Sequence, residues 1–345
     1  MISAILYEPN RIDVATTAVP DIRPGDLLLR MRAATICGTD IRIFRGKKTL
    51  GVRYPSVLGH EFAGEIIESG GHPGFAEGSR VGVCPSIPCG RCDRCKRGLE
   101  NLCADSLNFG YELDGGFAEI VRIPAAAVAA GNVRLLPETM SYGEAALVEP
   151  LACVLNGQEK AGVGFGDTVL VIGAGPIGCL HVLLAQRRGA ERIVVSDPNL
   201  HRREEAARCG ASVTVDPTQE DLRAVLHAAT GGRGADVVIC AIGIPALARQ
   251  ATDLVRHGGR LSLFAGFSKG ETAEMDVNAI HYNEITVTGA FGLTRRTFDM
   301  AFDMVASGGL DVAPLITASF PLQDAVQAFG VAETGSALKV ALINE

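Results

Sequence analysis

The sequence contains no tryptophan, and aromatic residues make up only 5% of its 345 positions. It also lacks any apolar run close to the roughly 20 residues that a membrane span requires. The start, MISAILYEPNRIDV, shows neither the charged region nor the apolar region of a secretory signal peptide. We therefore expect a soluble, cytoplasmic protein that has no membrane partner.

The sequence also has fewer basic than acidic side chains. The chain has 32 basic and 39 acidic side chains, a net charge of −7, and its one basic cluster, Arg91 to Arg97, is interleaved with cysteines. This balance argues against nucleic acid as a partner. Apolar residues make up 47% of the chain, and 345 residues exceed the size at which a single core usually keeps growing, so we expect two domains.

Cysteine, by contrast, is present at ten positions, four of them in the segment CGRCDRCKRGLENLC. Those four are Cys89, Cys92, Cys95 and Cys103. Four thiolates so close in sequence can close a tetrahedral site with no open position, which is typical of structural zinc. Disulfide bonds are the alternative, but thiols stay reduced in the cytosol.

The pattern of predicted secondary structure changes near residue 150. Before it, short β-rich runs such as DLLLRMRAA, FAGEIIES and RVGVCP are separated by Gly, Pro and Asp turn signals. After it come the apolar strands DTVLVIGAG, ERIVVSDP, ADVVICAIG, GRLSLFAGF and ITVTGAFG, with amphipathic helical stretches between most of them. This alternation predicts a parallel, doubly wound sheet. The helical run TFDMAFDMVASG and the strand ALKVALIN follow, and periodicity does not assign them to either unit.

A glycine motif follows the first of these later strands. In DTVLVIGAGPIG, Gly173, Gly175 and Gly178 lie between a buried strand and a helix, the context in which GxGxxG binds a dinucleotide pyrophosphate. Asp197, at the end of the next strand, is placed to accept hydrogen bonds from the adenosine ribose. The alternative is a glycine-rich turn followed by a chance acid. The predicted cofactor-binding residues are Gly173, Gly175, Pro176, Ile177, Gly178, Asp197 and Arg202.

A third set of residues is dispersed along the chain. It comprises Cys37 in CGTD, His60 and Glu61 in GHE, and Glu149 in VEPLA. Each residue alone is most often simply packed. Together they offer a thiolate, an imidazole and carboxylate oxygens, which suit a zinc site that keeps one position free for water or substrate.

The three sets, in this order, resemble the zinc-containing medium-chain dehydrogenase/reductase family over the whole chain. The resemblance implies an α/β protein with a GroES-like β-rich catalytic domain over residues 1–150. A doubly wound, parallel-sheet Rossmann domain that binds NAD is expected over 151–290, and a return segment of the catalytic domain over 291–345. It also implies two zinc ions per chain, one catalytic and one structural, a small-molecule alcohol substrate, and a homo-oligomer, either a tetramer or a dimer.

Within that family the chain is similar to the sorbitol and polyol dehydrogenase branch. Ordinary alcohol dehydrogenases carry a cysteine where this chain has Glu149, and EPLACVLNG and IHYNEITVTGAF also resemble the branch. Carried over, Cys37 and His60 are ligands of the catalytic zinc, Glu61 and Glu149 share the remaining role, and the Thr39 hydroxyl is the first proton acceptor. The expected reaction is NAD-linked oxidation of a secondary alcohol of a polyol, cyclitol or sugar alcohol, phosphorylated or not, to a ketone.

Two positions depart from the family pattern. Arg42 replaces a histidine that passes the proton to solvent in many relatives, and a guanidinium cannot do so because it is always protonated. Gly292 stands where sorbitol dehydrogenases have an arginine that contacts the polyol, while Arg295 and Arg296 lie further on. The substrate need not be sorbitol. Alternatives are a threonine or simple secondary-alcohol dehydrogenase, a quinone or enoyl reductase that lacks catalytic zinc, and a non-catalytic NADH-binding protein.

Overall fold

A computed structural model describes residues 1–345. The chain forms two compact units, Met1–Ala152 with Leu293–Glu345, and Cys153–Gly292. The segment after residue 292 therefore returns to the first unit, which answers the question that periodicity left open.

The first unit is rich in short strands, in keeping with its turn-punctuated sequence. Its strands are β1 (Ile2–Glu8), β2 (Arg11–Thr16), β3 (Leu27–Thr35), β4 (Ser56–Val57), β5 (Glu61–Ser69), β6 (Arg80–Val83), β7 (Ser86–Ile87), β8 (Leu107–Asn108), β9 (Ile120–Ile123), β10 (Val133–Leu135), β17 (Ile316–Pro321) and β18 (Lys339–Ile343). Its helices are α1 (Gly38–Phe44), α2 (Asp93–Lys96), α3 (Ala125–Ala129), α4 (Tyr142–Ala146), α11 (Arg295–Ala306) and α12 (Ala325–Thr334), with 3-10 turns at η1 (Glu100–Leu102), η3 (Ala313–Leu315) and η4 (Leu322–Asp324). Helix α5 (Val148–Ala161) begins in this unit and continues into the second.

Strand β3 organises the largest sheet of the first unit. The sheet runs in the order β10-β6-β5-β3-β18-β17, and β9 also pairs with β3. Most side chains of β3 are buried, and the strand has paired neighbours on both sides. Its antiparallel register sets Thr35 opposite Glu61 of β5 and opposite Ala341 of β18. Residues far apart in sequence thus meet at one end of β3.

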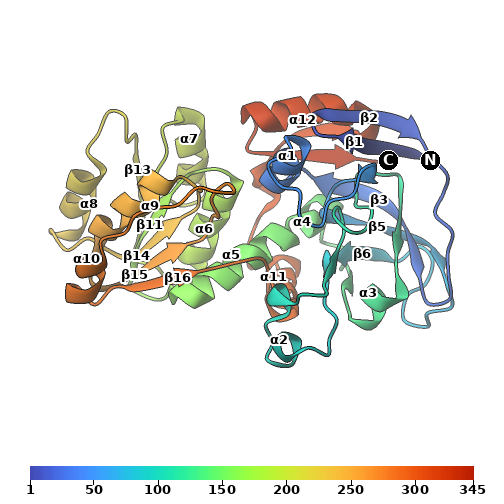
Figure 1. Ribbon diagram of the computed structural model, residues 1–345, viewed down its shortest axis with the longest axis horizontal. Coiled ribbons are helices and arrows are strands. Elements are labelled where there is room, and N and C mark those ends of the chain that lie inside the picture. The colour runs from blue at the N-terminus through green and yellow to red at the C-terminus, as the bar shows by residue number, and fades with distance from the viewer. The chain divides into compact units, whose positions relative to one another are not determined.

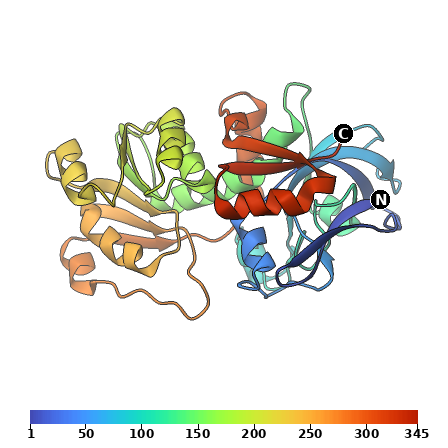
Figure 2. The same ribbon diagram turned by 90° about the horizontal axis from the view of Figure 1, so that it is seen from above.

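The C-terminal elements are part of the core of the first unit. Helix α12 lies beside the N-terminal strands β1 and β2 in Figure 1, and Figure 2 shows the same red and blue elements from above. Phe329 of α12 makes edge-to-face contacts with Phe44 and Phe117, with ring centroids 5.7 Å apart in both pairs. Val340 and Leu342 of β18 are buried in the same apolar cluster. Burial of this apolar surface ties the return segment to the N-terminal part of the chain.

The second unit alternates strands and helices (Figure 1). Its strands are β11 (Thr168–Ile172), β12 (Arg192–Ser196), β13 (Val213–Val215), β14 (Ala235–Cys240), β15 (Val255–Leu263) and β16 (Thr286–Gly289). Its helices are α6 (Pro176–Arg187), α7 (Leu200–Arg208), α8 (Leu222–Thr230), α9 (Pro245–Ala251) and α10 (Val277–Tyr282), with the 3-10 turn η2 (Thr252–Leu254). No helix of either unit combines the length and the apolar character that crossing a bilayer requires.

All neighbouring strands of the second unit are parallel, in the order β13-β12-β11-β14-β15-β16. The doubly wound sheet predicted from the sequence is therefore confirmed. The chain order reverses between β11 and β14, and ligands of such sheets bind where the strand order reverses, beyond the carboxyl ends of the strands. Strand β13 was not predicted, because three residues are too few to show a periodicity.

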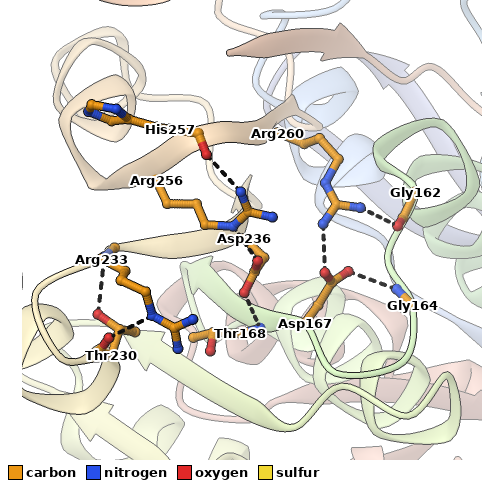
Figure 3. Close-up of polar contacts among 11 residues, drawn as sticks. Gly162, Gly164, Asp167, Thr168, Thr230, Arg233, Asp236, Arg256, His257 and Arg260 are labelled. Carbon is orange, nitrogen blue, oxygen red and sulfur yellow. Dashed lines mark hydrogen bonds and ion pairs between the residues drawn. The ribbon is translucent and has the colours of Figure 1, made fainter. Parts of the chain in front are cut away.

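Charged side chains join the starts of three of these strands (Figure 3). Arg260 on β15 forms an ion pair of 2.6 Å with Asp167, which directly precedes β11. Arg256 pairs with Asp236 on β14, and Asp236 accepts a 2.8 Å hydrogen bond from the backbone N–H of Thr168. This network holds the amino ends of β11, β14 and β15 in register, at the edge opposite the carboxyl ends.

Candidate metal centres and cofactor-binding loop

The four cysteines of segment 89–103 converge on one point. The Sγ of Cys92 lies 3.4 Å from that of Cys95 and 4.0 Å from that of Cys103, and the Sγ of Cys89 lies 3.9 Å from that of Cys95. Four sulfurs each about 2.3 Å from a zinc ion lie about 3.8 Å apart in a tetrahedron. A disulfide would bring two sulfurs to about 2.05 Å, and all four cysteines are unbridged. The spacing fits zinc and excludes the disulfide alternative.

Backbone N–H groups favour the thiolate form of Cys89. Hydrogen bonds from the backbone of Arg91 and of Cys92 lower the pKa of Cys89 to about 6. The backbone N–H of Cys89 in turn donates to the Sγ of Cys103 at 3.4 Å. Thiolates, rather than thiols, are zinc ligands. With four sulfurs in place the cluster leaves no position for substrate, so its chemistry is structural.

A second cluster lies at the end of the large sheet of the first unit. The ligand atoms of Cys37, His60 and Glu61 all lie within 4.8 Å of one another. Cys37 is the N-cap of α1, His60 directly precedes β5, and Glu61 is the first residue of β5. His60 and Glu61 are buried, whereas Cys37 is half-buried. The structure thus brings together three of the four dispersed residues that the sequence singled out.

Asp40 connects two residues of this cluster and was missed by the sequence analysis. Its Oδ2 accepts a 2.9 Å hydrogen bond from the backbone N–H of Cys37, and its Oδ1 lies 3.2 Å from the Nδ1 of His60. Asp40 is fully buried. Because its Oδ1 faces Nδ1 of His60, Nε2 is the ring nitrogen left for a metal. A carboxylate behind a histidine fixes the tautomer and orientation of the ring. The signal in the sequence was an acid three residues after the helix N-cap, the second half of a capping box.

Glu61 also has partners that the sequence did not reveal. The Nζ of Lys339 donates to Oε1 of Glu61 at 2.9 Å and lies 2.6 Å from Oε2, which also accepts a hydrogen bond from the Thr35 hydroxyl. Lys339 and Glu61 have exposed fractions of only 4% and 0%. Burial lowers the pKa of Lys339, but the charges of Glu61, Cys37 and Glu149 and the hydrogen bond to Glu61 together outweigh burial, so the net shift of the pKa is upward. Glu61 is therefore held as a buried carboxylate beside a cation.

Glu149 does not join Cys37, His60 and Glu61 within the 4.8 Å that separates their ligand atoms. It lies in the first turn of α5. Its charge raises the pKa of Lys339, the same lysine that forms the ion pair with Glu61. Thr39 lies half-buried on α1, two residues after Cys37.

The electrostatics of the second cluster suit a cation. Burial lowers the pKa of His60, but Tyr111, Asp40 and Cys37 outweigh burial and raise that pKa well above its usual range. A local field that holds a proton on a buried imidazole also favours a metal ion in the same place. One thiol, one imidazole and one carboxylate are also a donor set that catalytic zinc uses. On both counts the residues fit zinc.

The glycine loop of the second unit has the geometry that GxGxxG requires. Gly173 has a φ of +101°, a conformation that other residues rarely adopt. A Cβ on Gly178 would lie 1.9 Å from the carbonyl oxygen of Gly173, so only glycine lets α6 approach β11 this closely. Gly175 is the N-cap of α6, Pro176 its first residue, and a Cβ on Gly175 would meet nothing within 4 Å. The loop is therefore open beside the helix N-terminus, where a phosphate binds.

Asp197 supports this loop with both of its carboxylate oxygens. Oδ2 accepts a 2.8 Å hydrogen bond from the backbone N–H of Ala174, and Oδ1 accepts one of 2.9 Å from the backbone N–H of Asn199. Each oxygen keeps a further lone pair with which it can accept a ribose hydroxyl.

The two arginines that follow Asp197 differ in their contacts. Arg203 donates to the carbonyl oxygen of Asp197 at 2.7 Å and forms a 3.1 Å ion pair with Asp216, so its guanidinium is engaged within the unit. Arg202 has a buried Nε that has no hydrogen-bond partner in the protein.

Comparisons with known proteins agree with this fold and these clusters. Residues 23–133 match the alcohol dehydrogenase GroES-like domain family, and residues 176–307 match the zinc-binding dehydrogenase family. L-threonine 3-dehydrogenase of Pseudoalteromonas atlantica is 33% identical over 331 residues, which cover 94% of each chain. Sorbitol dehydrogenase of Bacillus subtilis is 32% identical over 334 residues, covering 95% of this chain and 93% of the relative. A crystal structure of a zinc-binding dehydrogenase from Sinorhizobium meliloti 1021 bound to NADP superposes with a TM-score of 0.91 at 32% identity, covering 99% of both chains.

A GroES-like unit that carries a Cys, His and Glu cluster and a four-cysteine cluster, joined to a Rossmann unit, defines a two-domain zinc oxidoreductase. The chain belongs to the zinc-containing medium-chain alcohol dehydrogenase family. It is accordingly a zinc-dependent, NAD(P)-linked alcohol or polyol dehydrogenase. The prediction of family, fold class and reaction class from the sequence is confirmed.

Proposed function

We propose that this dehydrogenase oxidises a secondary alcohol of a polyol, cyclitol or sugar alcohol, phosphorylated or not, to a ketone, with NAD as the oxidant. The observation that carries the proposal is the cluster of Cys37, His60 and Glu61, taken with Glu149, a carboxylate at the position where ordinary alcohol dehydrogenases have a second cysteine. A carboxylate donates less electron density than a thiolate, so the metal stays a stronger Lewis acid, and it can yield its place to a second substrate hydroxyl. The similarity to a sorbitol dehydrogenase supports the same substrate class.

The residues divide the work as follows. Cys37 and His60 would hold the catalytic zinc, with Glu61 and Glu149 sharing the remaining ligand role, and Cys89, Cys92, Cys95 and Cys103 would hold the structural zinc. When bound, the catalytic zinc supplies Lewis acidity and NAD supplies the hydride acceptor. The Thr39 hydroxyl would accept the proton that leaves the substrate alcohol and pass its own proton on toward solvent, so that the hydroxyl stays neutral. Asp40 orients the ring of His60.

NAD is proposed over NADP because of Asp197. Its buried carboxylate can accept hydrogen bonds from both ribose hydroxyls but would repel a 2′-phosphate. Arg203, which could otherwise hold that phosphate, is engaged with Asp216. The Sinorhizobium relative binds NADP, so the choice needs a direct test. Steady-state kinetics with both cofactors supply it, and a higher kcat/KM with NADP would overturn this part of the proposal.

The test of the substrate class uses variants of Glu149 and pairs of alcohols. We expect vicinal diols and polyols to be oxidised with higher kcat/KM than matched mono-alcohols. Glu149→Ala should lose one of two zinc ions and most of the activity, whereas Glu149→Gln should keep the metal and lose rate. Glu138→Ala, which removes an exposed carboxylate before α4, is the control. Near-normal turnover and two retained zinc ions in Glu149→Ala would mean that this residue only favours the start of α5.

L-threonine is the second candidate substrate, because one relative at 33% identity is an L-threonine 3-dehydrogenase. An NAD-reduction screen over sugar alcohols, inositols, their phosphates, threonine and simple secondary alcohols decides between the two. Assembly into a tetramer or dimer and a cytoplasmic location stay predictions.

A further inference from the structure

Two cationic side chains follow Cys37 closely in sequence and in space. Arg42 lies on α1, and its carbonyl oxygen accepts a 3.1 Å hydrogen bond from the backbone N–H of Lys48. The chain therefore folds back after α1, so that Lys48 returns to the helix that begins at Cys37. Both side chains are half-buried, whereas the intervening Lys47 is exposed.

Lys48 is connected to the candidate zinc site through one aromatic ring. Its Nζ lies 4.6 Å from the centroid of the Tyr111 ring, a cation–π distance. Tyr111 in turn stacks on His60, with ring centroids 5.4 Å apart and planes inclined by 25°. The ammonium group thus stands one ring away from a residue of the metal cluster.

The ammonium group of Lys48 donates a 3.3 Å hydrogen bond to the carbonyl oxygen of Leu50, a neutral acceptor. Burial lowers the pKa of Lys48, Glu112 acts in the opposite direction, and Arg42 lowers it further. Glu112 also accepts hydrogen bonds from the backbone and side chain of Asn108, at 2.9 and 3.1 Å. Arg42 and Glu112 therefore act in opposite directions on the Lys48 ammonium, and a half-buried ammonium that forms no ion pair favours the approach of an anion.

We infer that Arg42 and Lys48 bind an anionic group of the alcohol substrate, so that the enzyme acts on a sugar acid or a sugar-alcohol phosphate in preference to a neutral polyol. The inference rests on the proposed function and narrows its substrate class. A guanidinium can hold a carboxylate or a phosphate through two parallel hydrogen bonds, and an ammonium adds a point charge. This gives Arg42 a role at a position where it cannot pass on a proton.

The first arm of the test compares matched substrates: sorbitol, sorbitol 6-phosphate and gluconate. We expect at least one of the two anions to show a kcat/KM about 10-fold or more above that of sorbitol, mainly through a lower KM. The advantage should shrink as ionic strength rises from about 0.01 M to about 0.5 M, because salt screens partly exposed charges. The anion that gains distinguishes a carboxylate site from a phosphate site. Equal or higher kcat/KM for sorbitol would overturn the inference and leave the proposed function intact.

The second arm uses Lys48→Gln and Arg42→Gln, with Lys47→Gln as the control. The control removes the same charge from the same segment, but from an exposed side chain. We expect each test variant to lower kcat/KM for the preferred anion about 10-fold and to lower it less for sorbitol. Lys47→Gln should keep the wild-type ratio. An unchanged ratio in both test variants, with wild-type melting temperatures, would contradict the inference.

A binding arm separates this inference from the proposed function. Calorimetric titration of the zinc-loaded protein with gluconate and with sorbitol 6-phosphate needs no turnover. Saturable binding of one of them that is weakened about 10-fold in Lys48→Gln, and not in Lys47→Gln, supports the anion site even if no alcohol is oxidised. Absence of binding in the wild-type protein, together with no preference for anions in turnover, refutes it.

Discussion

Substitution of Lys339 by methionine should destabilise the first unit strongly. Methionine keeps most of the side-chain volume but removes the ammonium group that lies 2.6 and 2.9 Å from the two carboxylate oxygens of Glu61. Because both side chains are almost fully buried, Glu61 of the zinc-free protein would be left as a buried charge with only the Thr35 hydroxyl as partner.

Removal of one partner of a buried ion pair costs about 3–5 kcal/mol of unfolding free energy. For a unit of about 200 residues, 1 kcal/mol moves Tm by roughly 2–4 °C, so Lys339→Met should lower Tm by about 10 °C. Replacement of both partners, in Glu61→Gln with Lys339→Met, leaves no unpaired charge and should cost less than Lys339→Met alone. Arg11→Met is the surface control: Arg11 pairs with Glu8 at 3.6 Å with both side chains more than 60% exposed, and such pairs contribute about 0–1 kcal/mol.

The assay is chemical and thermal unfolding of five proteins, each with its zinc content measured. The wild type, Lys339→Met, Glu61→Gln and the double variant form a double-mutant cycle, and Arg11→Met is the surface control. If Lys339→Met costs less than about 1 kcal/mol, or if the double variant is no more stable than Lys339→Met, the ion pair does not stabilise the fold.

Three further predictions concern other parts of the chain. Burial lowers the pKa of His181 to about 3, so the folded state keeps this ring neutral while the unfolded chain takes up a proton below about pH 6.5. The free energy of unfolding should therefore decrease as the pH is lowered below about 6.5, by about 2 kcal/mol at pH 5. The His181→Gln variant should lack this part of the decrease. Equal decreases in urea titrations of both proteins would contradict the prediction. Cys95→Ser should release one zinc ion and lower Tm, because a closed site contributes folding energy, and two retained zinc ions with unchanged Tm would refute the structural assignment. Asp167→Asn removes the charge that pairs with Arg260 and should cost about 1 kcal/mol in the second unit, whereas no change in urea unfolding would show that the pair is screened.

Much of the fold could be predicted from the sequence because its signals are local. The apolar strand β11, the glycine loop and the helix after it are contiguous, so one segment contains the strand, the turn and the helix N-terminus. Strand β13 could not be found, since Val213–Val215 is short and partly exposed. The return of residues 293–345 to the first unit depends on long-range contacts, such as that between Phe329 and Phe117, which no periodicity encodes.

The candidate site also contains residues that the sequence predicted and residues that depend on long-range contacts. The four cysteines and the glycine loop were found from spacing, and the dispersed cluster from residue types that zinc prefers. Asp40 was overlooked although it lies three residues from Cys37, because its capping role and its contact with His60 become visible together only in the folded chain. Lys339 could not be paired with Glu61 from sequence, since 278 residues separate them and only the register of β3 with its neighbours brings them together.

The position of Lys339 near the end of the sequence also determines the order in which the two units can fold during synthesis. Glu61 leaves the ribosome early, whereas its counter-charge is synthesised only after the entire second unit. Until then, β3 lacks β18 as a neighbour, and the apolar side chains that α12 will cover face water. The Rossmann unit can complete its sheet from one continuous stretch of chain during translation, whereas the catalytic unit must wait for its last strand. A nascent chain released before that strand emerges would have exposed apolar side chains and an open sheet edge, both of which favour recognition by chaperones and proteases.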